Sequence, residues 1–312
     1  MKPEISVVMA CYNEPVAWLT EAIHSILNQT FKELELLVVV DNPNHQDAIT
    51  RVTEMAESDN RLRVLVNEKN MGLPRSLNRG FSEAKGALFA RMDADDIADK
   101  DRFLRQADYL TQNPEIDLIG TAIENIDARG EHVGIKTFLT SPEAIEKAIK
   151  YRSVACHPTW LMRRHVYESI NGYRYFPSSE DYDFLYRVLD AGFRIANLEA
   201  VLLKYRLHDN SMTSALSAFQ YQVKGYIQTL HRQRVQTGED NYSPEVALNL
   251  KKETATNAKS SYLVTKAREA EEGRKMVRLA FWGSLAVLFS GSGMARVKSF
   301  LGFRYVKWRY ER

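Results

Sequence analysis

The chain has 312 residues, of which 45% are hydrophobic and 26% charged, with a formal net charge of +2. This is the composition of an ordinary globular protein, and the length suits one compact domain with an appendage. So small a net charge argues against strong nucleic-acid binding. Cys11 and Cys156 lie far apart and match no zinc or redox spacing, which excludes a disulfide framework and suits a reducing compartment. The apolar run at the N-terminus is too short for a secretory signal, so we expect the body of the protein to be cytoplasmic.

Short apolar runs alternate with amphipathic segments through the first 93 residues. Strands are expected at 5–10, 34–41, 62–67 and 87–93, and helices at 15–29, 47–58 and 73–84. This alternation is typical of an α/β fold with a parallel sheet and right-handed crossovers. In such sheets ligands bind beyond the carboxyl ends of the strands. Neither a Gly-x-Gly-x-x-Gly fingerprint nor a P-loop follows the first strand, so a nucleotide would bind by another route.

Carboxylates crowd together directly after the fourth expected strand, where Asp93, Asp95 and Asp96 fall within four positions. Like charges this close repel one another, and a hard divalent cation such as Mg²⁺ or Mn²⁺ resolves the conflict through oxygen ligands. Capping of the next helix explains Asp99 or Asp101, but it explains the first three poorly. An EF-hand fails on spacing. The cluster therefore predicts a metal site that holds a diphosphate.

Five stretches of this sequence together resemble a known family. They are "SVVMACYNEP", "VVVD", "NMGLPRSLNRGFSEAKGALFARMDADD", "SSEDYDFLYRVL" and "YRLHDNSMT", in that order. The chain is similar over residues 4–215 to family 2 glycosyltransferases of the GT-A fold, especially bacterial enzymes of exopolysaccharide, capsule and O-antigen assembly. The resemblance implies a mostly parallel nucleotide-binding sheet flanked by helices. It also implies an inverting transfer of a sugar from a nucleotide diphosphate sugar to an acceptor hydroxyl.

On the donor side, the resemblance implies that Asp41 hydrogen-bonds the uracil ring. Tyr12, Asn13 and Glu14 would line the base and the ribose. Arg75 stands where family members approach the diphosphate, although a solvated arginine is the simpler alternative. Many relatives carry a second acid after the first aspartate, whereas "DNPN" stands here, which leaves the contacts to the base open.

For the metal, the resemblance implies that Asp95 is a ligand and that Asp93 contacts the ribose or the metal. Arg206 and His208 lie two positions apart, so they share a face if the segment is extended. Arg206 could then bind diphosphate oxygens, and His208 could complete the metal shell. A structural histidine is the alternative for His208.

An inverting transfer needs a carboxylate that takes the proton from the acceptor hydroxyl. In the family the aspartate of a Glu-Asp pair has this role, which implies Asp181 as the base and Glu180 as an acceptor contact. Asp183 is expected to support the helix that follows. His157 resembles a family residue near the acceptor side, and a hydrogen-bonded core histidine is the alternative.

The C-terminal third differs in character from the rest. Residues 209–275 have a helical, polar pattern with a break at 237–244. The last 39 residues carry nine Arg and Lys against one acid, Glu311, and contain an uncharged stretch at 279–295 that is short for a membrane span. Aromatic and basic residues then alternate, which favours an in-plane membrane anchor over a helix packed on the main domain. The expected domains are a GT-A catalytic domain at 1–215, a helical extension at 216–273 and a membrane-associating tail at 274–312.

Together these observations predict a metal-dependent inverting glycosyltransferase that uses Mn²⁺ or Mg²⁺. We expect it to move a hexose, preferably from UDP-galactose or UDP-glucose, onto an undecaprenyl-diphosphate-linked saccharide in a β linkage. The expected location is the cytoplasmic face of the inner membrane. A non-catalytic membrane-bound scaffold that binds nucleotide sugars is the alternative. A sugar nucleotidyltransferase is disfavoured, because no glycine-rich basic loop follows the first strand.

Overall fold

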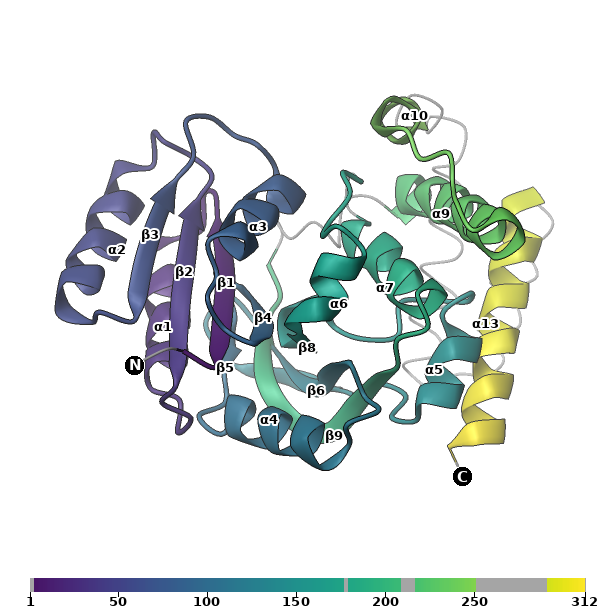
Figure 1. The fold of residues 1–312 in the computed structure, drawn as a ribbon, viewed down its shortest axis with the longest axis horizontal. Coiled ribbons are helices and arrows are strands. Elements are labelled where there is room, and N and C mark those ends of the chain that lie inside the picture. Colours follow the sequence, from purple (N-terminus) through teal and green to yellow (C-terminus); the bar gives the residue numbers. More distant parts are fainter. Residues whose placement is uncertain (1–2, 177–178, 209–216, 251–290, 312) are drawn as a thin grey trace.

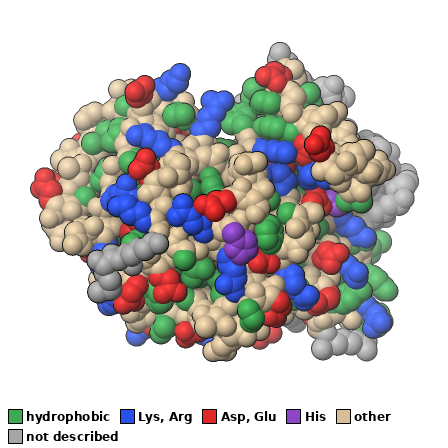
Figure 2. Space-filling model, viewed as in Figure 1, with side chains coloured by type: hydrophobic (Ala, Val, Ile, Leu, Met, Phe, Trp, Pro, Cys, Tyr) green, Lys and Arg blue, Asp and Glu red, His purple; other side chains and the backbone are tan. Residues whose placement is uncertain are grey.

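The computed structural model describes residues 3–176, 179–208, 217–250 and 291–311. A curled sheet runs through the molecule, with helices on both faces and a group of helices at one side (Figure 1). The strands are ordered β3-β2-β1-β4-β8-β6-β9-β5, and β7 pairs with β6. Acidic and basic side chains are interspersed over the face shown in Figure 2.

Residues 5–93 form the alternating unit that the sequence predicts. Its elements are β1 (Ile5–Cys11), α1 (Val16–Leu27), β2 (Leu34–Val40), α2 (Gln46–Ser58), β3 (Leu62–Val66), α3 (Leu73–Ser82) and β4 (Leu88–Asp93). Strands β3, β2, β1 and β4 pair in parallel. β1 and β2 are buried on both faces because helices cover both sides of the sheet.

Residues 97–206 add strands that run both ways. Its elements are β5 (Ile97–Ala98), α4 (Arg102–Gln112), β6 (Leu118–Ile126), β7 (His132–Lys136), α5 (Pro142–Ala148), the 3₁₀ turn η1 (His157–Thr159), β8 (Leu161–Arg163), α6 (Arg164–Ser169), α7 (Glu180–Asp190) and β9 (Ile195–Arg206). The short β8 is antiparallel to both β4 and β6, whereas β9 is parallel to β6. The predicted α/β fold with a mostly parallel sheet is confirmed.

Two hydrophobic clusters lie on opposite faces of the sheet. Successive residues of β2 point to opposite faces, so that Leu37 lies in one cluster and Leu36 in the other. The first cluster contains residues of α3, α6 and α7, and the second contains residues of α1, α2 and α4. The helix α7, which carries the second predicted acid pair, is therefore packed against the sheet rather than attached at its edge.

The C-terminal helices pack on this body. They are α9 (Ser217–Thr237), α10 (Pro244–Asn249) and α13 (Gly291–Tyr310). The predicted break after residue 237 is confirmed, and α9 and α10 form the described part of the predicted helical extension, whose residues 251–273 lie outside the described residues. Val223, Ile227 and Leu230 of α9 lie in the same hydrophobic cluster as α7, and α13 lies along α5 (Figure 1). The three-way domain division stays a prediction.

Much of the predicted tail, including residues 279–290, lies outside the described residues. Among the helices that the structure describes, none combines the length and the apolar character that a membrane crossing requires.

Candidate active site

Three of the predicted site residues lie at the carboxyl edge of the parallel strands. Tyr12 follows β1, Asp41 follows β2 and Asp93 ends β4. These strands are neighbours in register, with Cys11 opposite Val40 and Ala10 opposite Asp93. The sheet thus brings together residues that are more than 80 positions apart in the sequence.

The acidic cluster is compact. Asp93, Asp95 and Asp96 each offer an oxygen within 4.8 Å of the others. Asp96 is buried, and its Oδ1 accepts a hydrogen bond of 2.9 Å from the backbone N–H of Arg206. Its Oδ2 is buried without a hydrogen-bond partner among the described residues. Burial, and then the charge of Asp93, raises the pKa of both Asp95 and Asp96. A cation at this cluster would satisfy the orphaned oxygen and remove the repulsion.

His208 joins this cluster from the end of β9. Its Nε2 lies 2.9 Å from Asp95 Oδ2. Its ring lies 5.3 Å from that of Trp18 on α1, centroid to centroid, which holds the imidazole from the other side. An imidazole in contact with an acidic cluster is suited either to metal ligation or to orienting the carboxylate.

Arg206 is buried and its guanidinium is engaged by protein groups. Nε donates to the carbonyl of Asp95 at 2.9 Å, and Nη2 lies 2.7 Å from Glu21 Oε2. The guanidinium also stacks 5.0 Å from the ring centre of Trp18. These contacts favour a role in holding the acidic loop, and the predicted contact between Arg206 and a diphosphate stays a prediction.

Asp41 is buried and holds the turn that leads into α3. Its Oδ1 accepts hydrogen bonds from Asn67 Nδ2 at 2.6 Å and from the Met71 N–H at 2.8 Å. Its Oδ2 accepts one from the Gly72 N–H at 2.8 Å. Gly72 has φ +82°, a conformation that favours glycine. Arg75 follows in the first turn of α3 and is exposed.

The turn after β1 is tied to the same edge. The Tyr12 N–H donates to Glu14 Oε2 at 2.6 Å, while the Tyr12 side chain is exposed. Asn42 Nδ2 donates to Asn13 Oδ1 at 2.6 Å, which links the turns after β1 and β2. Burial raises the pKa of Glu14, and the charges of Asp95 and Asp93 add to the shift. Glu14 thus lies within electrostatic range of the acidic cluster.

The second acid pair occupies the first turn of α7. Glu180 is buried and Asp181 is partly exposed. Burial, and then the charge of Asp181, raises the pKa of Glu180 to about 8, and burial also raises the pKa of Asp181. Asp183 pairs with Arg187 one turn on, at 2.8 Å between Oδ2 and Nε, so it supports the helix as expected. The pair therefore combines a buried acid that keeps its proton near neutral pH with a more accessible carboxylate, as acid–base chemistry requires.

His157 lies beside the second acid pair. Its Nε2 shares a hydrogen bond of 2.8 Å with the Tyr173 hydroxyl, and its Nδ1 is 4.0 Å from Glu180 Oε1. Burial, and then the nearby charge of Arg91, holds the pKa of His157 well below its usual value. A neutral imidazole at 4.0 Å makes no ion pair, so the contact with Glu180 is one of proximity.

Arg91 is a functional candidate that the sequence analysis did not identify. It is buried on β4 and forms an ion pair with Asp93. Its positive charge also acts on Glu180 and Asp181. Nε and Nη1 of Arg91 have no hydrogen-bond partner among the described residues. Arg91 and Asp93 are two positions apart in an expected strand, so the sequence predicts that they share a face of the sheet. Nothing local in the sequence indicates that Arg91 lies close to the acid pair of α7.

Relatives of this chain are glycosyltransferases, among them proteins of bacteria and archaea. An uncharacterised glycosyltransferase of Methanocaldococcus jannaschii is 34% identical over 66% of this chain and 71% of its own length. The O-antigen biosynthesis glycosyltransferase WbnJ of Escherichia coli is 30% identical over 71% of this chain and 86% of its own. An E. coli UDP-Gal:α-D-GlcNAc-diphosphoundecaprenol β-1,3-galactosyltransferase is 28% identical over 65% and 74%.

Solved structures share the fold. The Staphylococcus aureus TarS fragment 1–349 in complex with UDP-GlcNAc has a TM-score of 0.63 at 18% identity and covers 99% of this chain and 91% of its own. The mannosyltransferase PcManGT of Pyrobaculum calidifontis, in complex with GDP-Man and Mn²⁺, has a TM-score of 0.56 at 14% identity and covers 100% and 88%.

The family model for glycosyl transferase family 2 matches residues 6–170, which run from β1 through α6. This range includes the acidic cluster at the end of β4 and the turns after β1 and β2. With the fold, the site geometry and these relatives in agreement, the chain belongs to glycosyl transferase family 2.

Proposed function

We propose that this glycosyltransferase moves a hexose from a UDP-sugar, with UDP-galactose or UDP-glucose preferred, onto an undecaprenyl-diphosphate-linked saccharide. The transfer inverts the anomeric carbon and gives a β linkage. One observation carries the proposal: the acidic cluster at the end of β4 and the Glu180–Asp181 pair at the start of α7 are linked by the charge of Arg91. This arrangement suits a donor held at one site and an acceptor activated at the other.

The residues of the acidic cluster fit a divalent cation, either Mn²⁺ or Mg²⁺. Asp93, Asp95 and Asp96 would hold it, with His208 completing the shell, and the orphaned Oδ2 of Asp96 supports this assignment. When bound, the ion neutralises the charge that develops on the leaving diphosphate. The complex of the archaeal mannosyltransferase with GDP-Man and Mn²⁺ is in keeping with such a site.

The acid pair supplies the proton transfer. We assign Asp181 as the base that accepts the proton of the acceptor hydroxyl while that oxygen attacks the anomeric carbon. Glu180, protonated near neutral pH, is suited to donate a hydrogen bond to the acceptor. Asp41 and Tyr12 to Glu14 would bind the base and ribose, and Arg75 the diphosphate.

The name of the E. coli galactosyltransferase supports a UDP-sugar donor and a lipid-linked acceptor, and the UDP-GlcNAc complex of TarS supports the nucleotide. The helix α13 supports association with a membrane surface. It buries Val306, while Leu301, Tyr305 and Trp308, which share one helical face, are exposed beside Arg304. We therefore propose that the enzyme works at the cytoplasmic face of the inner membrane.

The test uses the purified full chain, a panel of nucleotide sugars and a synthetic lipid-diphosphate saccharide, with Mn²⁺, Mg²⁺ or EDTA. Metal-dependent consumption of one UDP-sugar is expected, and NMR of the product gives the anomeric configuration. Asp181→Asn should still bind the donor, but its rate of transfer should fall by a factor of about 10²–10⁴. Asp108→Asn, an exposed aspartate on α4, is the matched control. If the wild type binds a donor but does not turn it over, the alternative of a non-catalytic scaffold that binds nucleotide sugars is favoured.

A further inference from the structure

Three consecutive residues, Tyr173, Arg174 and Tyr175, connect the two halves of the site. They follow α6 and precede α7 in the chain. Each contacts a different part of the molecule: the acceptor side, the C-terminal helical region and the donor side. The position of this segment is therefore relevant to both substrates.

Tyr175 lies against the start of α3. The guanidinium of Arg75 is 5.3 Å from the centre of its ring. A β-carbon at Gly72 would lie 3.6 Å from Tyr175 Cε2, so the ring rests on the turn that Asp41 holds. Tyr175 thus sets where the exposed cation of Arg75 lies.

Tyr173 reaches the other side. Its hydroxyl bonds His157 at 2.8 Å, and its ring stacks 4.6 Å from Phe184 of α7, between centroids. His157 in turn lies beside Glu180. A shift of the segment would therefore move contacts to Arg75 and to the acid pair at the same time.

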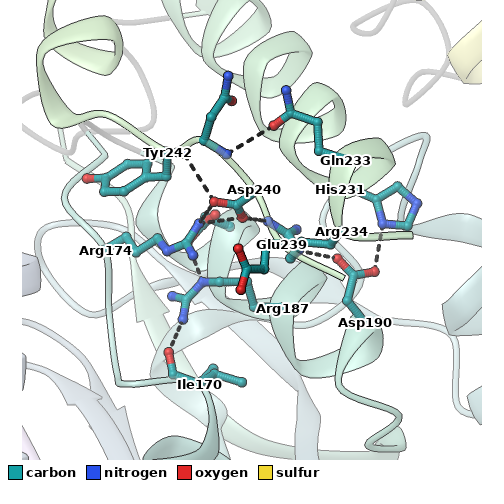
Figure 3. Close-up of polar contacts among 12 residues, drawn as sticks. Ile170, Arg174, Arg187, Asp190, His231, Gln233, Arg234, Glu239, Asp240 and Tyr242 are labelled. Carbon is teal, nitrogen blue, oxygen red and sulfur yellow. Dashed lines mark hydrogen bonds and ion pairs between the residues drawn. The ribbon is translucent and has the colours of Figure 1, made fainter. Parts of the chain in front are cut away.

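Arg174, between them, is anchored by a carboxylate far away in sequence. Its Nη1 donates to both oxygens of Asp240, at 2.9 Å and 2.7 Å (Figure 3). Asp240 lies after α9, and its side chain is 1% exposed. It also pairs with Arg234 of α9 and accepts a bond of 3.1 Å from the Tyr242 N–H. Buried charges held by this many partners are well ordered.

The same region makes two further contacts with the segment. The Tyr242 hydroxyl donates to the Tyr175 carbonyl at 2.7 Å, and the Tyr242 ring lies 4.9 Å from the guanidinium of Arg174. Arg234 also bonds Asp190 at the end of α7, at 2.7 Å. Asp240 thus fixes the segment relative to the catalytic helix through one network (Figure 3).

We propose that Asp240 is a positioning residue of the active site, which holds Arg174 so that Tyr175 sets Arg75 on the donor side and Tyr173 sets His157 beside Glu180. The helical region after residue 216 then takes part in donor binding without touching the donor. This inference rests on the proposed function, because it assigns Arg75 to the diphosphate.

The experiment is a double-mutant cycle on the full chain, with calorimetric titration of UDP in the presence of Mn²⁺. Asp240→Asn keeps the shape but weakens the pairing, and Arg75→Ala removes the cation through which it acts. We expect each variant alone to weaken UDP binding by about tenfold, and the double variant to be no weaker than Arg75→Ala, because coupled residues are not additive. Glu239→Gln, the exposed neighbour, is the matched control and should bind like the wild type.

If Asp240 had only a structural role, Asp240→Asn would weaken UDP binding by the same factor in the wild type and in the Arg75→Ala variant. This additive result would overturn the proposal. If Asp240→Asn does not fold, Tyr242→Phe repeats the cycle, since it removes one hydroxyl contact to Tyr175. An unchanged UDP affinity in both variants also refutes the proposal. A wild type that binds no UDP with Mn²⁺ refutes the proposed function itself, which separates the two failures.

Discussion

Glu180 gives a prediction that connects the site to stability. Its side chain is buried in the first turn of α7, and burial with the nearby Asp181 raises its pKa to about 8 from an ordinary 4.5. The folded protein therefore keeps a proton at this position that the unfolded chain has lost at neutral pH. The perturbation is Glu180→Gln, which has the shape of the protonated acid and cannot ionise.

The sign follows from the direction of the shift. Because the folded pKa lies above the unfolded one, the stabilising contribution of Glu180 is fully present below pH 4.5 and is lost as the pH rises through 8. With 1.36 kcal/mol per pKa unit, the free energy of unfolding falls by about 2 kcal/mol between about pH 6 and pH 8 from this residue alone. Glu180→Gln lacks this fall in the free energy of unfolding, so its stability relative to the wild type increases as the pH rises.

Urea unfolding in EDTA at a series of pH values from slightly acidic to slightly alkaline measures this difference directly. Glu199→Gln, at an exposed carboxylate of β9, is the control and should keep the wild-type pH dependence. Other titrating groups act equally in both proteins, so the comparison isolates Glu180. If Glu180→Gln loses stability with pH as steeply as the wild type, Glu180 does not hold the proton and the acid–base assignment of the pair is wrong.

Three other predictions concern the metal, the helix α7 and the membrane. Mn²⁺ at about 100 Kd should stabilise the fold by about 2.7 kcal/mol, seen as a higher melting temperature, and Asp95→Asn should abolish this rise; a rise that persists contradicts the metal assignment. Asp183→Asn leaves the buried Arg187 on α7 without its ion-pair partner, so urea unfolding should show a loss of about 3–5 kcal/mol, and a loss below about 1 kcal/mol would refute this account. Replacing Tyr305 and Trp308 by Ala should reduce sedimentation with phosphatidylglycerol vesicles, whereas equal binding by variant and wild type would rule out this face of α13 as the lipid contact.

Local sequence was sufficient for the parallel half of the sheet. Apart from Ser6 and Glu35, the strands β1 and β2 are apolar runs, and such runs between amphipathic helices have few other structures available. The acidic cluster was equally accessible, because Asp93, Asp95 and Asp96 are near neighbours in the chain and their crowding is visible without a fold. Contacts of short range in sequence are the ones that composition and periodicity specify.

The tertiary structure decided what these elements do together. The chain separates His208 from Asp95 by 113 positions, and Asp240 from Arg174 by 66. Arg206 illustrates the limit: its spacing from His208 is visible in the sequence, but only the fold shows that protein acceptors already engage its guanidinium. The sequence by itself thus determined the family, the four strands within the first 93 residues and the cluster of acids. Packing between distant segments determined which charges are buried and paired, because burial depends on neighbours that local periodicity does not specify.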